Sequence, residues 1–331
     1  MASPLFRRRH HGCSQAIHRH HREPSRQSLR LLVYLAFTLV SAAESLASDN
    51  PTLRAQPDSL MTYIYNAPES GLDNRYRYQW EILRTALERT SPKYGPYRMT
   101  ASEPMSEHRQ TLELLHATGK ISVMYLDTTP EREKTLLPIH IPVDKNLVGY
   151  RIFLIRSDSR NRFNSIRTVD DLRGFRFGLG LGWADVDILK ANNFKVVTGS
   201  NYEGLFEMLV QKRFDIFSRG AEEIVDEYDL RKKKLPQLAI EQTLILYYPL
   251  PMYFWFSKTD EGRKLAARTE EGMRSMLADG TYDRIFDRYF KQTLGRLKLD
   301  KRRILRINNP LLGPETPMND ARLWFDPFSK H

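Results

Sequence analysis

Short apolar runs of strand length alternate along this chain with longer stretches that show the 3.6-residue apolar period of helices. The first part predicts strands at 61–65, 97–100 and 121–126, with helices at 74–89 and 106–118. The second part predicts strands at 175–179, 194–197 and 214–217, with helices at 184–191, 202–212 and 221–228. This repeated order predicts an α/β fold with two mostly parallel sheets flanked by helices.

A polar turn separates the strand at 121–126 from the next predicted strand at 150–155. Thr129 and Arg132 lie in this turn, in the order Thr-Pro-Glu-Arg. Ligands of open α/β sheets bind at the carboxyl ends of strands, and an arginine there offers a planar fork of donors to a carboxylate or phosphate. A surface arginine in a polar turn is the alternative, because charged side chains are mostly exposed. The residues alone leave both interpretations open.

Alternating glycines at 178, 180 and 182 connect the strand at 175–179 to the next helix. The Gly-Lys-Ser/Thr of a phosphate loop and the dinucleotide-binding spacing are both missing. The glycines instead favour a turn that approaches a ligand closely, with the helix N-terminus directed at it. Trp183 and Asp185 in this turn are therefore candidate ligand contacts, and Glu69 is a third candidate because of its position in an early loop.

The last part of the chain predicts two strands, at 238–246 and 252–257, and a long helix from Thr259 that breaks around Gly280. The tail at 295–331 contains several prolines and few apolar runs, so we expect it to wrap over the surface. Trp324 and Phe325 are its expected anchors.

Charge adds an N-terminal feature to this pattern. The formal charge is +11, of which residues 1–47 contribute +5 from seven Arg and two Glu, so 11 − 5 = +6 remains for the rest. Both signs are interspersed in that remainder, whereas nucleic-acid binders concentrate Lys and Arg on one face or arm. We therefore expect no nucleic-acid partner.

Residues 1–47 have the pattern of a signal peptide. An arginine-rich start precedes thirteen uncharged, mostly apolar residues at 31–43, and Ser45-Leu46-Ala47 fits the small-x-small cleavage pattern. The apolar run is short for a membrane span, which needs about twenty residues. The predicted location is the periplasm, with a polar linker at 48–60. The long arginine-rich region leaves a misassigned start or an uncleaved anchor open.

Cysteine and histidine usage indicates a chain without disulfide, metal or cofactor. Cys13 is the only cysteine and precedes the apolar run, so the exported chain would have none. Five histidines lie at 10–21, in the part that would be discarded. His108, His116, His140 and His331 remain, without a metal or Ser-His-Asp spacing. We therefore assign no catalytic residue.

Four motifs resemble the amino-acid-type periplasmic solute-binding proteins of family 3. They are Thr129-Pro130-Glu131-Arg132, the Thr-Val-Asp-Asp-Leu-Arg-Gly run at 168–174, Lys-Arg-Phe-Asp at 212–215 and Ala-Asp-Gly-Thr-Tyr-Asp at 278–283. The resemblance covers roughly 61–294 and implies the two-lobed type II periplasmic-binding fold. Lobe one would combine 60–152 with 250–331, lobe two would be 155–246, and the crossover strands would be 150–156 and 248–256.

The resemblance implies a monomeric binding protein that holds a small ligand between its lobes, for the permease of an ABC importer or for a membrane sensor. In that family the arginine of Thr-x-x-Arg grips the ligand carboxylate, which implies this role for Arg132 with help from Thr129. A few relatives are dehydratases, so an enzyme on the same fold stays an alternative. A sensory or interaction module with a vestigial site is another.

Arg219 departs from the family pattern. Family members usually place an acidic residue there to meet the ligand ammonium. If Arg219 faces the cleft opposite Arg132, two positive charges favour a ligand with two anionic groups. Alternatively Arg219 pairs with Glu222 or Glu223, at spacings of three and four. The sequence leaves the two interpretations of Arg219 open, and a plain α-amino acid stays a possible ligand.

The signal-peptide interpretation predicts a mature protein that begins near Ser48. N-terminal sequencing of the protein recovered from the periplasmic fraction should start there. An intact Met1 on protein from the cytoplasmic fraction would contradict the interpretation.

Overall fold

The computed structural model describes residues 60–68, 71–105 and 107–328. The predicted signal peptide at 1–47, the linker at 48–60 except for its last residue, and Glu69 lie outside the described residues. Among the described helices, none combines the length and the apolar character that a membrane span requires.

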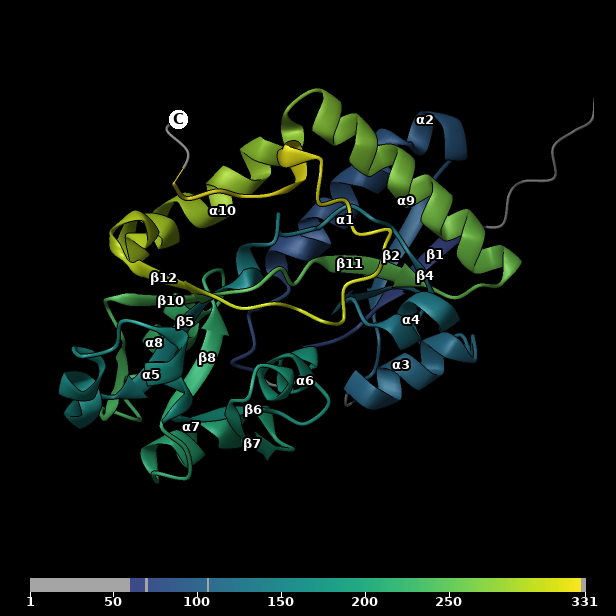
Figure 1. The fold of residues 1–331 in the computed structure, drawn as a ribbon. Helices are drawn as coiled ribbons and strands as arrows, with labels where there is room; N and C mark the ends of the chain where they lie inside the picture. Colours follow the sequence, from purple (N-terminus) through teal and green to yellow (C-terminus); the bar gives the residue numbers. More distant parts are fainter. Residues whose placement is uncertain (1–59, 69–70, 106, 329–331) are drawn as a thin grey trace, which may run out of the picture. The chain divides into compact units, whose positions relative to one another are not determined.

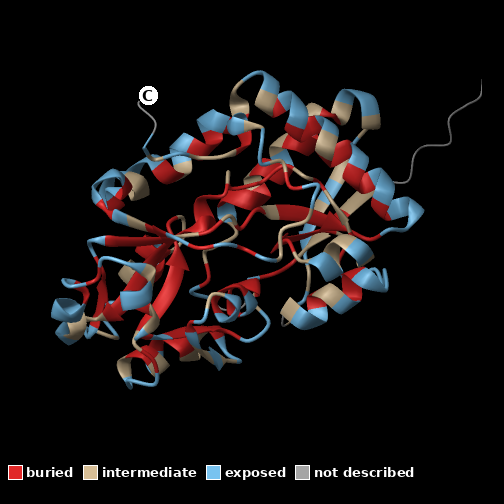
Figure 2. Cartoon of the chain, viewed as in Figure 1, coloured by how far each residue is buried: buried red, intermediate tan, exposed pale blue. Residues whose placement is uncertain are grey.

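Lobe one is built on two small sheets. They comprise β1 (Met61–Tyr65) with β2 (Tyr97–Ala101), and β3 (Met124–Asp127), β11 (Met252–Phe256) and β4 (Leu137–Pro138). The first pair is parallel, a bridge from Tyr65 to Val123 connects it to the second sheet, and β11 runs antiparallel to both of its neighbours. β3 and β11 are mostly buried, whereas most residues of β1, β2 and β4 are half-buried or exposed (Figure 2).

Lobe two is built on a seven-stranded sheet. Along the path of neighbours its strands are β12 (Arg303–Arg306), β10 (Leu244–Tyr247), β5 (Tyr150–Arg156), β8 (Ile216–Gly220), β6 (Arg176–Gly180) and β7 (Lys195–Gly199), and β9 (Leu238–Ile240) also pairs with β5. β5 pairs in antiparallel orientation with β8, β9 and β10. The sheet is therefore mixed rather than mostly parallel, because β5 enters it from lobe one against the direction of β8.

Helices cover both sets of strands (Figure 1). They are α1 (Arg77–Arg89), α2 (Ser91–Tyr94), α3 (Glu107–Leu115), α4 (Pro130–Thr135), α5 (Val169–Arg173), α6 (Ala184–Ala191), α7 (Tyr202–Val210), α8 (Ile224–Arg231), α9 (Asp260–Ala278) and α10 (Thr281–Leu297). Local signals explain several boundaries: Thr168 and Asp171 form a capping box at α5, and Gly280 adopts a left-handed φ of 73° between α9 and α10.

The C-terminal tail contains a strand that the sequence pattern did not predict. β12 pairs in parallel with β10, so this part of the tail extends the sheet of lobe two, although the sequence assigned all of 250–331 to lobe one. Further on, the Trp324 indole N–H donates to the Pro317 carbonyl at 2.8 Å, and the Phe325 ring packs against Phe286 at 5.5 Å. The tail thus contacts both lobes.

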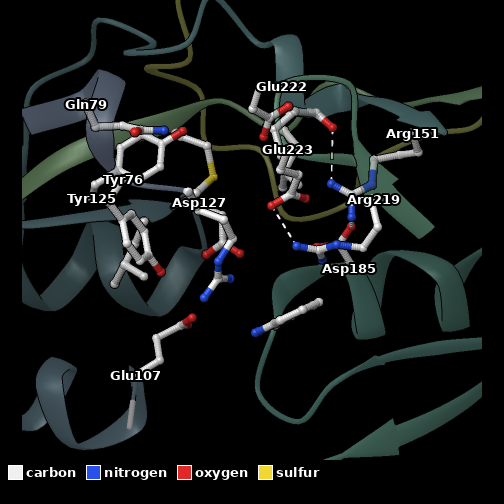
Figure 3. A pocket seen from close by; sticks show the side chains of 16 residues that line it. Tyr76, Gln79, Glu107, Tyr125, Asp127, Arg151, Asp185, Arg219, Glu222 and Glu223 are labelled. Carbon is white, nitrogen blue, oxygen red and sulfur yellow. Dashed lines mark hydrogen bonds and ion pairs between the residues drawn. The ribbon is translucent and has the colours of Figure 1, made fainter. Parts of the chain in front are cut away.

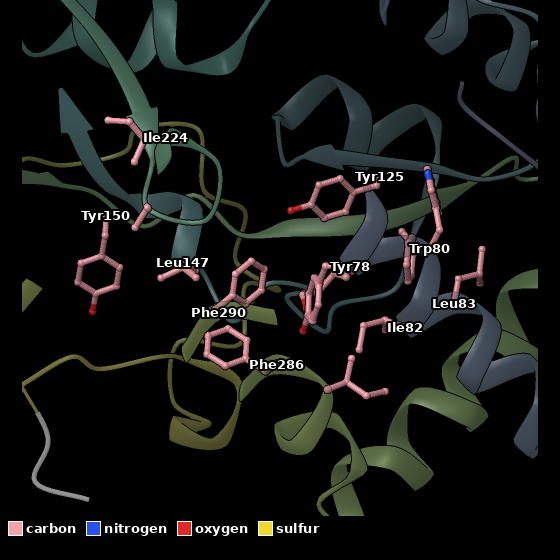
Figure 4. Packing of buried hydrophobic residues seen from close by; sticks show 14 of the residues in the cluster. Tyr78, Trp80, Ile82, Leu83, Tyr125, Leu147, Tyr150, Ile224, Phe286 and Phe290 are labelled. Atoms are coloured by element: carbon pink, nitrogen blue, oxygen red, sulfur yellow. The ribbon is translucent and has the colours of Figure 1, made fainter. Parts of the chain in front are cut away.

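A continuous apolar cluster packs α1 against α10 and reaches the loop before β5 (Figure 4). Its centre is Tyr78, whose ring lies 4.8 Å from that of Phe290. The hydroxyls of Tyr78 and Tyr282 both donate to the Val143 carbonyl, at 2.9 and 2.7 Å. The hydroxyls of these two tyrosines are therefore paired within the core, as buried polar atoms mostly are.

Arg268 is a buried cation that ties α9 to the end of α1. Its Nε donates to Thr90 Oγ1 at 3.1 Å, and its Nη2 donates to the carbonyls of Leu87 and Gly95 at 3.1 and 2.8 Å. Arg268 is fully buried, so its charge depends on these acceptors within the chain.

We predict that Arg268→Met destabilises the protein by about 3 kcal/mol, because it removes several charge-assisted hydrogen bonds that join α9 to Thr90, Leu87 and Gly95. Chemical denaturation measures the loss. Arg274→Met on the same helix is the control, since Arg274 is exposed and pairs with the exposed Glu270, and it should cost less than about 0.5 kcal/mol. Equal losses in the two variants would refute this account of Arg268.

Candidate functional site

The Thr-Pro-Glu-Arg turn forms the start of a helix. Thr129 is the N-cap of α4, and its Oγ1 accepts the backbone N–H of Arg132 at 3.2 Å. Pro130 suits the first helical position because it has no N–H to leave unpaired. The Thr129 hydroxyl is therefore engaged in capping.

Arg132 is held by acidic residues of its own lobe. Its guanidinium forms an ion pair with the Asp127 carboxylate, and Nη2 donates to Glu107 Oε1 at 3.2 Å. The Arg132 side chain is only 12% exposed and is not among the residues that line the nearby pocket. This geometry does not support the predicted role of Arg132 as a ligand anchor, because its guanidinium N–H groups already bind the carboxylate of Asp127.

The pocket lies between lobe one and lobe two and has a volume of about 80 Å³ (Figure 3). Lobe one lines it with Arg75, Tyr76, Gln79, Glu107, Tyr125, Leu126, Asp127, Val148, Leu250 and Met252. Lobe two contributes Arg151, Trp183, Asp185, Arg219, Glu222 and Glu223. Three of the six candidate residues, Trp183, Asp185 and Arg219, are thus brought together here.

The glycine-rich turn places Trp183 and Asp185 at the start of α6. A side chain at Gly180 would collide with the Trp183 ring, and Gly182 adopts a left-handed φ of 91°, so glycine is needed at both positions. Asp185 lies in the first turn of α6, where a carboxylate is favoured. It forms an ion pair with Arg151 at 3.0 Å and accepts the Tyr248 hydroxyl, so its charge is balanced within lobe two.

Arg219 both lines the pocket and pairs with acidic residues. Its Nη2 lies 2.6 Å from a carboxylate oxygen of Glu223 and 2.6 Å from one of Glu227, and its Nε donates to Glu227 at 2.8 Å. Burial opposes the charge, but the two glutamates outweigh it and raise the pKa of Arg219. Of the two partners considered from the sequence, Glu223 pairs with Arg219 and Glu222 does not, while Glu227 was not foreseen.

Asp127 connects the two lobes. Besides its ion pair with Arg132, its Oδ2 accepts the backbone N–H of Ala184, the first residue of α6, at 3.2 Å. Asp127 is 7% exposed. The carboxylate of one lobe therefore occupies the anion-attracting N-terminus of a helix in the other.

Three acidic side chains lie together at the pocket: Asp144, which is fully buried, and Glu222 and Glu223, which are half-buried. Burial raises the pKa of Asp144 to about 7, although the backbone N–H groups of Val148 and Asn146 donate to it. Burial also raises the pKa of Glu222 well above its usual value, and the neighbouring Glu223 and Asp144 raise it further. The pKa of Glu223 is raised by burial as well, against the opposing charge of Arg219. Burial at this end of the pocket therefore disfavours the ionised forms of these carboxyl groups.

Several lining residues were missed by the sequence reasoning. Asp127 is the last residue of an apolar strand, a position at which a charged residue is itself a signal. Glu222 was considered only as a possible partner of Arg219. The sequence pattern did not identify Tyr76, Gln79 and Tyr125 as pocket residues, because a helical or strand pattern does not distinguish core positions from pocket walls.

Solved structures of amino-acid-binding proteins share this fold. An ancestral arginine-binding protein bound to arginine is 19% identical, with a TM-score of 0.50, over 70% of this chain and 98% of that one. The substrate-binding protein AbpA of an amino acid ABC transporter from Streptococcus pneumoniae, bound to L-arginine, is 16% identical, with a TM-score of 0.51, over 70% and 96%. AncCDT-1, an ancestral amino-acid-binding protein described as a precursor of cyclohexadienyl dehydratase, is 17% identical, with a TM-score of 0.51, over 70% and 96%.

The chain therefore has the two-lobed α/β fold of type II periplasmic binding proteins. At these identities the similarity concerns the fold and leaves the ligand undefined. No protein-family profile and no curated protein matches the sequence.

The carboxyl cluster predicts that stability falls as the pH rises. A carboxyl group whose pKa is raised by folding binds more protons in the folded state than in the unfolded state. This difference exists between its pKa in the unfolded chain, about 4, and its pKa in the folded chain, which is about 7 for Asp144. The cluster's stabilisation is therefore full below pH 4 and is lost as the pH rises through that window. Carboxyls with lowered pKa values, such as Glu227, stay ionised from pH 5 to 8.

We expect the substitution Glu222→Gln to increase the melting temperature more at pH 8 than at pH 5, each measured against the natural protein. Each 1 kcal/mol recovered corresponds to about 2–4 °C. Scanning calorimetry at both pH values measures the difference. Glu270→Gln, on the exposed face of α9, should leave the pH dependence as it is. The cluster is not the cause if the two variants behave alike.

Proposed function

We propose that this protein is an exported solute-binding protein that holds a small ligand in the pocket between its lobes. The observation that carries the proposal is the pocket itself, which is lined by both lobes of a fold shared with amino-acid-binding proteins of ABC transporters. Sites of this kind place a few polar groups among apolar walls, and here Leu250 and Met252 provide apolar surface beside the charged residues.

The proposed partner is the permease of an ABC importer or a membrane sensor. The solved relatives that carry ABC-transporter descriptions support the first of these. Trp183, Asp185 and Arg219 are proposed to shape the ligand site from lobe two, with Asp185 and Arg219 acting through the carboxylate pairs described above. The enzyme alternative predicts consumption of the ligand, which the proposed function does not.

A ligand that binds the folded chain must raise its melting temperature. A free ligand at one hundred times its Kd stabilises by about 2.7 kcal/mol, or roughly 4–5 °C for a chain of this size. We predict such a shift with at least one member of a panel of amino acids, amines, dicarboxylates and phosphorylated or sulfonated small molecules. A folded protein that responds to none of them would count against a solute-binding role.

Tyr76→Ala tests whether the bound ligand occupies this pocket. Tyr76 forms part of the pocket wall and packs edge-on against Tyr125 at 6.3 Å. Losing an aromatic wall should weaken binding about tenfold, by roughly 1.4 kcal/mol. Tyr94→Ala is the matched control, because Tyr94 lies in α2 and contacts Glu271 away from the pocket. Calorimetric titration should show weaker ligand binding in Tyr76→Ala than in Tyr94→Ala. Recovery of intact ligand after incubation with the natural protein excludes turnover.

A further inference from the structure

The positive charges around the pocket are already neutralised by the chain. Each arginine that lines it forms an ion pair with a carboxylate: Arg75 with Asp73, Arg151 with Asp185, and Arg219 with Glu223 and Glu227. Arg132, just outside the lining, is held by Asp127 and Glu107. A ligand carboxylate would have to compete with a buried internal carboxylate at every one of these positions.

The helix N-terminus that faces the pocket region is also occupied. The Ala184 N–H at the start of α6 donates to Asp127 Oδ2. An anion bound at this helix would need the same N–H and the same face of Arg132. Asp127 therefore fills, from within the chain, the position where an anionic ligand group would bind.

Two acceptor oxygens and a hydroxyl are left over in the pocket. Gln79 Oε1, Glu222 Oε2 and the Tyr125 hydroxyl, which can donate or accept, are buried and make no hydrogen bond of normal geometry among the described residues, although the Gln79 side chain lies close enough to interact with the Tyr125 hydroxyl. Gln79 and Tyr125 are 2% and 4% exposed, and both line the pocket with Glu222. Unpaired buried acceptors are costly, so a ligand that donates hydrogen bonds to them is favoured.

Glu222 is the acidic group at this point, and a cation bound against it would favour its ionised form. Its carboxylate lies against the backbone of Gly220, where any side chain would collide with it. It forms no ion pair with the described residues and lies close enough to raise the pKa of Tyr125, after the larger effects of burial and of Asp144. The lining holds five acidic side chains and three arginines, and adding the residues that pair with them, Asp73, Glu227 and Arg132, gives seven acidic side chains to four arginines, an excess of acidic groups. This excess favours a cation.

We propose that the pocket binds a compact organic cation, such as the ammonium end of an amine, and that its ligand carries no carboxylate. Glu222 binds the cationic nitrogen, and Gln79 Oε1 and the Tyr125 hydroxyl accept its remaining N–H groups. The volume of about 80 Å³ suits a small group, since about 150 Å³ accommodates benzene. This inference rests on the proposed solute-binding function and replaces the sequence-based expectation of an anionic ligand.

Matched pairs of compounds that differ only by a carboxylate test this ligand class. The pairs are ethylamine with L-alanine, putrescine with L-ornithine, and agmatine with L-arginine. Calorimetric titration of the full chain should show at least one amine binding ten or more times more tightly than its amino acid. Equal or tighter binding of the amino acids overturns the inference, as does binding of a dicarboxylate or phosphorylated compound alone, and either result leaves the solute-binding function standing. A folded chain that binds no solute at all removes both.

Two variants test the assigned residues separately. Glu222→Gln keeps the shape and removes the charge, so amine affinity should fall about thirty-fold or more. Glu270→Gln should leave it unchanged. Asp127→Ala vacates the internal carboxylate, so amino acids should gain at least tenfold in affinity while the amines do not. Unchanged amine binding in Glu222→Gln, or unchanged amino-acid binding in folded Asp127→Ala, contradicts the corresponding assignment.

Discussion

A buried guanidinium group needs a carboxylate or carbonyl partner within the chain, and much of this structure is arranged around that requirement. Removing a cation from water is expensive unless its donors are paired. Arg151 meets Asp185 at the start of α6, Arg219 meets Glu223 and Glu227 at the start of and within α8, and Arg268 meets the carbonyls that end α1. Each pair fixes the position of a helix relative to a strand or a second helix.

The same requirement shapes the pocket. The arginines that line the pocket form ion pairs within the chain. The polar groups that remain at the pocket surface are therefore carboxyl groups and acceptor oxygens. Asp127 has a second effect, since its bonds to Arg132 and to the Ala184 N–H join lobe one to α6 of lobe two. The contact between the lobes therefore depends on this carboxylate. In the proposed site the class of ligand depends on it as well.

This arrangement also explains why a shared fold says little about the ligand here. The solved amino-acid-binding proteins share the architecture at identities below 20%. Recognition depends on a few side chains at the carboxyl ends of strands, and these can change charge while the sheets and helices that carry them stay the same. Function in such a fold has to be argued from the pocket.

The sequence by itself determined the α/β order, the caps and many of the buried faces. Thr259 starts its helix as predicted, and Leu265, Thr269, Met273 and Met276 lie on the buried face of α9. Thr129, which the sequence placed in a polar turn, caps α4. These features are local, because capping and helical periodicity involve residues within a few positions of one another.

Only the tertiary structure decided the pairing of charges and the direction of the strands in lobe two. Arg219 and Glu227 are eight residues apart and meet because a turn returns α8 onto β8, while β12 joins β10 from more than fifty residues away. Arg132 showed the same limit at short range. The family resemblance implied a ligand anchor, but which carboxylate Arg132 holds depends on the approach of Asp127 and Glu107 in space. Electrostatic pairing acts through distance and burial, which a linear pattern does not contain.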